Sequence, residues 1–216
     1  MKPSKTIIKM DSKHAFILLA LVLTLAMGAR GGDPDILTDF VVPQGANEVN
    51  ATFFTYTGMR TLIQEQAQPA NFTVTKATMA EFPALNGQSV SYAVLQFPVG
   101  TVNPPHTHPR ASELLLLTYG SLEVGFIDTT SKLYTQTLQA GDIFVFPKGL
   151  VHFQYNPSPK DFALAVSAFG SASAGTVSLP VSVFGTGIDD TILAKSFKSD
   201  VQTIQKLKAG LTPPPK

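Results

Sequence analysis

The chain has no cysteine, only four histidines among its 216 residues, and few charged side chains. Without cysteine no disulfide can form, so a hydrophobic core must hold the fold by itself. Charged residues make up 14% of the chain and hydrophobic residues 44%, with a formal net charge of +1. This balance excludes a disordered chain and provides no basic surface for nucleic acid. The length fits one domain with a sizeable core.

The N-terminal segment has the features of a secretory signal. Lysines precede the apolar run AFILLALVLTLAM, and small residues follow it in AMGARGG. This run is shorter than the roughly 20 residues of a membrane-spanning helix, so it favours a cleaved signal over a membrane anchor. We expect residues 1–28 to be the signal peptide, with Gly28 or Ala29 as its last residue. Residues 29–216 would then form a single domain with no membrane span.

Two Asn-x-Thr triplets become meaningful once secretion is assumed, although such triplets also arise by chance. They begin at Asn50 and Asn71. We expect both asparagines to be glycosylation sites. Asn71 is favoured because its surroundings, QPANFTV, are typical of an exposed turn.

Short segments with a period of two fill the middle of the chain. They are rich in Val, Phe, Tyr and Leu and are separated by Gly, Pro, Asn and Ser: SVSYAVLQFPVG, SLEVGFID, LYTQTLQAGDIFVFP and FALAVSAFG. This pattern predicts an all-β domain, an antiparallel sandwich or barrel, over about residues 72–185. Leu114–Leu117 is continuously apolar. It predicts a strand that is buried on both faces or covered by a partner subunit.

The period changes to that of a helix over about residues 188–211. Apolar residues recur there at steps of three or four, namely Leu193, Phe197, Val201, Ile204 and Leu207. Ser199-Asp200 marks a possible break into two helices. The apolar face packs either on its own domain or on a neighbouring subunit, and both alternatives stay open.

Three of the four histidines lie in two short blocks. NPPHTHPRASE contains His106, His108 and Glu113, and FPKGLVHFQYN contains His152, whereas His14 lies in the expected signal. Residues two apart on a strand point to the same side, so His106 and His108 face one direction. The neighbouring prolines restrict the backbone and orient both rings in advance.

Three imidazoles and one carboxylate that converge inside a barrel form a metal site. Such a set can hold a divalent ion with octahedral preference and leave two positions open. A closed structural site is tetrahedral and typically rich in cysteine. An isolated histidine is more often a hydrogen-bonded core or surface residue, but the full spacing from Gly100 to Asn156 favours the metal. An open site indicates chemistry on a small ligand.

These blocks resemble the paired motifs of the cupin superfamily, specifically of the plant germins and germin-like proteins. DPDILTDF also resembles the mature N-terminus of that family. The resemblance implies a cupin jelly-roll β-barrel with C-terminal α-helices that clasp neighbouring subunits of a homohexamer, a trimer of dimers. It also implies secretion to the apoplast and contact with the cell wall. The implied ligands of Mn²⁺ are His106, His108, Glu113 and His152.

The chain departs from the germin pattern at several positions. Asn103 matches an asparagine near the metal of germins that oxidise oxalate, but a second active-site asparagine of those enzymes falls on Ala93. Alanine cannot donate a side-chain hydrogen bond to a dicarboxylate, which disfavours oxalate oxidation. Val41 replaces a cysteine that the family usually carries. Ala140-Gly141-Asp142 replaces a Lys/Arg-Gly-Asp/Glu tripeptide and disfavours an adhesion motif.

The resemblance favours a redox enzyme acting on a small anionic ligand at the metal. Superoxide dismutation would produce hydrogen peroxide for plant defence and cell-wall cross-linking. Oxalate oxidation is the second option. The third is a non-catalytic receptor or wall protein whose metal is structural, although the intact ligand set argues against pure storage.

Overall fold

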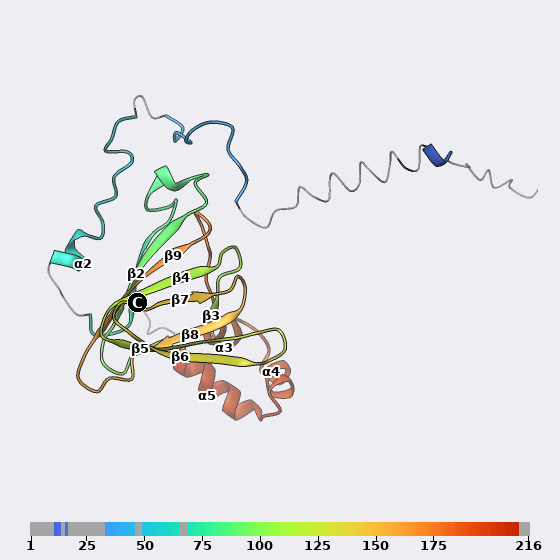
Figure 1. Cartoon of the computed structure of the whole chain (residues 1–216). Coiled ribbons are helices and arrows are strands. Elements are labelled where there is room, and N and C mark those ends of the chain that lie inside the picture. The colour runs from blue at the N-terminus through green and yellow to red at the C-terminus, as the bar shows by residue number, and fades with distance from the viewer. Residues whose placement is uncertain (1–10, 14–15, 17–32, 46–48, 65–68, 212–216) are drawn as a thin grey trace, which may run out of the picture. The chain divides into compact units, whose positions relative to one another are not determined.

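The computed structural model of the chain describes residues 11–13, 16, 33–45, 49–64 and 69–211 (Figure 1). By its internal contacts the chain divides into residues 1–31 and 32–216. Nearly all of the expected signal, residues 1–28, lies outside the described residues. The architecture given below is that of the second unit. In the described part of the chain, no helix is long and apolar enough to cross a membrane.

The strands of the described residues form two antiparallel sheets of five strands each, which confirms the predicted jelly-roll barrel. The first sheet, in spatial order, consists of β1 (Thr73–Ala77), β2 (Ser91–Phe97), β9 (Ala163–Phe169), β4 (Glu113–Tyr119) and β7 (Ile143–Phe146). The second consists of β10 (Val177–Ser178), β3 (Val102–Thr107), β8 (Val151–Tyr155), β5 (Ser121–Ile127) and β6 (Leu133–Gln139). Figure 1 shows β9, β4 and β7 side by side.

The core lies on the inner faces of the two sheets, because successive side chains of a strand point to opposite faces. Its largest fully buried apolar side chains are Phe97, Leu115, Leu117, Leu122, Val124 and Phe146. Burial of each such side chain stabilises the fold by about 1.5–3 kcal/mol. This core provides the stability that a chain without cysteine needs.

The continuous leucine run is not buried on both faces. Leu115 and Leu117 are fully buried, whereas Leu114 and Leu116 are 49% and 36% exposed. Strand alternation explains this, because successive side chains of β4 point to opposite faces of the sheet. The expectation of a strand buried on both faces within one chain is therefore wrong. Coverage by a partner subunit stays a prediction.

Short helices complete the described unit. They are α2 (Arg60–Gln64), the 3-10 helix η1 (Pro83–Leu85), α3 (Leu179–Phe184), α4 (Asp190–Ser196) and α5 (Val201–Leu211). The break expected at Ser199-Asp200 lies between α4 and α5. Asp189 caps α4 by accepting hydrogen bonds from the backbone amides of Thr191 and Ile192. The two helices pack through Leu193, Ala194 and Ile204, as the helical period requires.

The N-terminal segment of this unit is attached without a disulfide. The Asp33 carboxylate accepts hydrogen bonds from the Ser171 hydroxyl and the Ala172 backbone amide, each at 2.6 Å. Further along, the Gln88 side chain donates to the Asp39 carbonyl at 3.3 Å. Polar contacts to the barrel therefore hold the segment in a chain in which Val41 replaces the family's cysteine.

Gly120 is required by the turn between β4 and β5. Its φ is +82°, and a Cβ atom there would lie 2.4 Å from the Phe162 carbonyl oxygen and 2.9 Å from Ala163 Cα. We expect Gly120→Ala to lower the free energy of unfolding by about 3 kcal/mol or more, because backbone must move. Urea unfolding measures this loss.

Gly141 offers a matched control, since its φ is +101° but a Cβ atom there meets nothing within 4 Å. Gly141→Ala should cost only about 1 kcal/mol, for the unfavourable backbone conformation. Equal losses in the two variants would contradict the close approach at Gly120.

Candidate metal centre

The four predicted ligands come together between the two sheets. His106 lies on β3 and pairs in register with His152 on β8, His108 directly follows β3, and Glu113 begins β4. One ligand atom from each side chain lies within 4.8 Å of every other, and all four residues are buried. A register shift between Asn103 and His106, where two prolines stand, places the first two rings. The structure therefore contains a buried group that can hold a metal ion.

Backbone carbonyls orient all three rings. The Nδ1 atom of each histidine lies at hydrogen-bond distance from a carbonyl oxygen, in the pairs His106–Pro104 at 2.8 Å, His108–Gly175 at 2.5 Å and His152–Leu150 at 2.8 Å. A carbonyl can only accept, so each Nδ1 carries the proton. In the neutral ring, Nε2 then keeps its lone pair free for a metal.

The Glu113 carboxylate divides its two oxygens between different tasks. Oε2 lies 3.1 Å from Nε2 of both His108 and His152. Oε1 accepts a hydrogen bond from the Ser167 hydroxyl at 2.6 Å and lies 3.5 Å from Gln154 Nε2. The carboxylate thus presents one oxygen to the rings while buried donors hold the other.

Asn103 extends this network toward the pocket. Its amide donates to Gln154 Oε1 at 2.7 Å and lies 3.5 Å from His106 Nε2. Gln154 and Ser167 are both fully buried, and the sequence analysis did not single them out. A signal for each exists: Gln154 follows His152 by two residues on one strand, and Ser167 is the only polar residue of FALAVSAFG.

Burial and hydrogen bonds set the charges of this group. Burial, and then the neighbouring His152, lower the pKa of His106 to about 4. For Glu113, burial acts to raise the pKa, but His108 and His152, which donate to the carboxylate when their rings are protonated, outweigh it and hold the pKa below its usual value. At neutral pH the carboxylate is therefore ionised and His106 is neutral. Free Nε2 lone pairs 3.1 Å from a carboxylate oxygen repel it unless a cation lies among them, so the arrangement fits a divalent metal.

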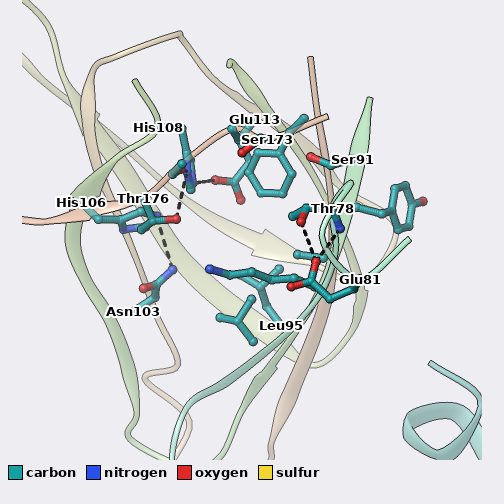
Figure 2. Close-up of a pocket in the computed structure, with 17 residues that line it drawn as sticks. Thr78, Glu81, Ser91, Leu95, Asn103, His106, His108, Glu113, Ser173 and Thr176 are labelled. Atoms are coloured by element: carbon teal, nitrogen blue, oxygen red, sulfur yellow. Dashed lines mark hydrogen bonds and ion pairs between the residues drawn. The ribbon is translucent and has the colours of Figure 1, made fainter. Parts of the chain in front are cut away.

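A pocket of about 450 Å³ gives access to this group. Figure 2 shows Asn103, His106, His108 and Glu113 on one side of the pocket, and Thr78 and Glu81 on the other. Three of the four members of the metal group, His106, His108 and Glu113, line this pocket, so a small ligand that enters it can reach them.

The remaining predicted residues lie elsewhere. Asn50 and Asn71 are exposed and lie outside both the metal group and the pocket. The Asn50 side chain accepts a hydrogen bond from the Thr52 amide at 2.9 Å. Glycosylation of the two asparagines stays a prediction. Ala93 is buried and lines the pocket, as expected for a position beside the site.

A barrel of two antiparallel sheets around a buried group of three histidines and a glutamate defines a cupin. Residues 62–205 match the Cupin family model. The chain is 66% identical over 206 residues to Germin-like protein 9-3 of Oryza sativa subsp. japonica, covering 93% of this chain and 96% of that protein. It is 56% identical to Germin-like protein 9-1 of the same plant, covering 95% and 85%. The chain therefore belongs to the germin-like proteins of the cupin family.

A solved structure agrees with this assignment. Oxalate oxidase in complex with the substrate analogue glycolate superposes with a TM-score of 0.72 at 32% sequence identity. The match covers 83% of this chain and 98% of that one.

The Ser167 hydroxyl should contribute to metal affinity by fixing Glu113. We expect Ser167→Ala to weaken the binding of a divalent metal about tenfold, since loss of a hydrogen bond that orients a ligand typically costs this much. Titration of metal-stripped protein with Mn²⁺ measures the affinity. Ser91→Ala is the control, because it removes a buried hydroxyl that donates to the Ser171 carbonyl instead. Equal affinities in the two variants would count against the assigned role of Ser167.

The metal-free protein should lose stability as the pH falls from 6.5 to 4. The folded pKa of His106 is about 4 against 6.5 for the free side chain. Within this window the unfolded chain binds a proton that the folded chain does not, so acid favours unfolding, by up to about 3 kcal/mol. Urea unfolding of chelator-treated protein across this range, beside His106→Asn, measures the effect. If His106→Asn lost stability with falling pH as steeply as the original chain, His106 would be excluded as the cause.

Proposed function

We propose that the chain is a secreted manganese protein that dismutates superoxide in the plant cell-wall space and produces hydrogen peroxide there. The observation that carries this proposal is the closeness of the ligand atoms: one nitrogen from each of the three imidazoles and one carboxylate oxygen lie within 4.8 Å of one another. Membership in the germin-like proteins supports the wall location and a role in defence and wall redox chemistry.

The donor set fits manganese. Imidazole nitrogens and a carboxylate oxygen suit divalent ions that prefer six ligands, and the chain offers four. One carboxylate and three neutral imidazoles leave a divalent ion about one net positive charge, which attracts a small anion. Bound manganese would supply the change of oxidation state that dismutation needs.

The residues beside the group would position the small anion. Asn103 has one amide hydrogen engaged by Gln154 and a second that points away from this bond. The Asn103 amide nitrogen also lies 3.5 Å from His106 Nε2, and once a metal occupies the lone pair of that atom, the second hydrogen would be available to an anion bound there. Asn103 is therefore proposed as a positioning residue.

Oxalate oxidation is the second candidate, because the matched structure is an oxalate oxidase. Ala93 argues against it. This residue is 1% exposed and forms part of the pocket wall, where its methyl group offers no hydrogen bond to a dicarboxylate. Superoxide, which needs no such second contact, is the better fit.

Secretion and oligomerisation form part of the proposal. Residues 1–28 would be the cleaved signal, and the exposed Asn50 and Asn71 would accept glycans. The outer face of β4 and β7 exposes apolar side chains that a partner subunit would cover, namely Leu114, Leu116, Ile143 and Val145. Such a surface supports the proposed homohexamer, a trimer of dimers.

Metal analysis combined with two activity assays tests the proposal. Purified secreted protein should contain about one manganese per chain, consume superoxide and leave oxalate unchanged. His106→Ala/His152→Ala should lose the metal and reduce superoxide consumption at least about 100-fold. Dismutation that survives in the metal-free variant would contradict the metal mechanism, and rapid oxalate consumption would favour the second candidate.

A further inference from the structure

A lysine lies on the pocket side of the first sheet, at the position paired with Ala93. Lys76 on β1 and Ala93 on β2 are direct partners in the antiparallel register. Directly opposite residues of an antiparallel pair project from the same face of the sheet. Both residues line the pocket, and so does the next pair along the same face, Val74 and Leu95. The Lys76 side chain therefore projects over the pocket.

This row of residues leads directly to the metal group. Ala93 pairs in turn with Ser167 on β9, and the Ser167 hydroxyl holds Glu113 Oε1 at 2.6 Å. Neighbouring strands lie about 4.8 Å apart, so the Cα atoms of Lys76 and Ser167 are about 10 Å apart. The small Ala93 lies between them and leaves room above it. A flexible four-carbon stem can bring the lysine ammonium across this space toward a ligand at the metal.

The Lys76 ammonium is available to such a ligand. No ion pair of 4 Å or less involves it among the described residues, and its charge acts on Glu81 only at longer range, where it helps to lower the pKa of that carboxyl after the Thr78 hydrogen bonds. Glu81 is the acidic residue that shares the pocket outside the metal group. Its carboxylate accepts hydrogen bonds from the Thr78 amide at 2.9 Å and the Thr78 hydroxyl at 2.6 Å. Those bonds engage the Glu81 carboxylate with Thr78, so Lys76 is not held in a close ion pair.

The pocket is much larger than superoxide requires. Its volume is about 450 Å³, whereas a water molecule occupies about 30 Å³ in the liquid. Pockets of about 300–1,000 Å³ are typical of organic ligands. Val74, Leu95 and Phe169 supply apolar walls of the same pocket. A carbon chain can contact such walls along its length.

We propose that this pocket binds an organic dicarboxylate longer than oxalate, with one carboxylate at the metal group and the other on Lys76. The loss of a donor at Ala93 removes a contact close to the metal, and Lys76 provides one farther out. Oxalate, a two-carbon diacid, is too short to contact both the metal group and Lys76. A diacid with one or more carbons between its two carboxylates can contact both. This inference rests on the proposed function, because a bound cation forms one of its two poles.

Calorimetric titration of the metal-loaded protein tests the inference. After the manganese content has been measured, the protein is titrated with acetate, malonate and succinate. We expect malonate or succinate to bind about tenfold more tightly than acetate. Lys76→Met should remove this advantage, while acetate affinity changes less than about twofold, because acetate reaches only the metal. Lys76→Arg should retain most of it.

Two control variants separate the contact from general electrostatics. Lys160→Met removes the same charge from an exposed loop outside the pocket and should leave dicarboxylate affinity unchanged. Glu81→Gln removes the competing negative charge and should raise dicarboxylate affinity. Equal dicarboxylate affinity in Lys76→Met and the original metal-loaded chain would overturn this inference and leave the proposed function intact. A purified chain that binds no manganese would overturn both.

Discussion

The hydrogen bonds from three ring Nδ1 atoms to backbone carbonyls are the interactions on which the site depends. They fix the tautomer of His106, His108 and His152 and direct each Nε2 toward the same centre as Glu113 Oε2. Burial makes this costly without a cation, because free lone pairs then face a carboxylate in a medium of low dielectric. The geometry is therefore that of a metal-binding site. The folded barrel holds the four ligating side chains close together, although their mutual repulsion lowers the stability of the metal-free protein.

The barrel supplies this precision because the ligands lie on paired strands of a rigid core. His106 and His152 are register partners on β3 and β8, while Glu113 comes from the opposite sheet. Ser167 on β9 then restrains the carboxylate from behind. The pairing of His106 with His152 and the contact of Ser167 with Glu113 join residues far apart in the sequence, so the complete site forms only when both sheets have formed.

Residue type and local period predicted the fold class and the four ligands. The alternating segments indicated antiparallel strands, and the spacing around His106 and His152 indicated convergence. The supporting residue Ser167 and the pairing of Lys76 with Ala93 were not predicted, because they depend on which strands become neighbours and in which register. A local pattern contains no information about register between distant strands. The same limit explains the wrong expectation for the leucine run, since nothing local shows whether an outer face is covered.

The central claim concerns where the cation binds and which atoms hold it. A crystal structure of manganese-loaded protein, with anomalous scattering data collected at the manganese edge, tests it most directly. The account predicts one anomalous peak within coordination distance of Nε2 of His106, His108 and His152 and of Glu113 Oε2, with the remaining positions open toward the pocket. A peak elsewhere, or an ion that contacts fewer than three of these side chains, would contradict it.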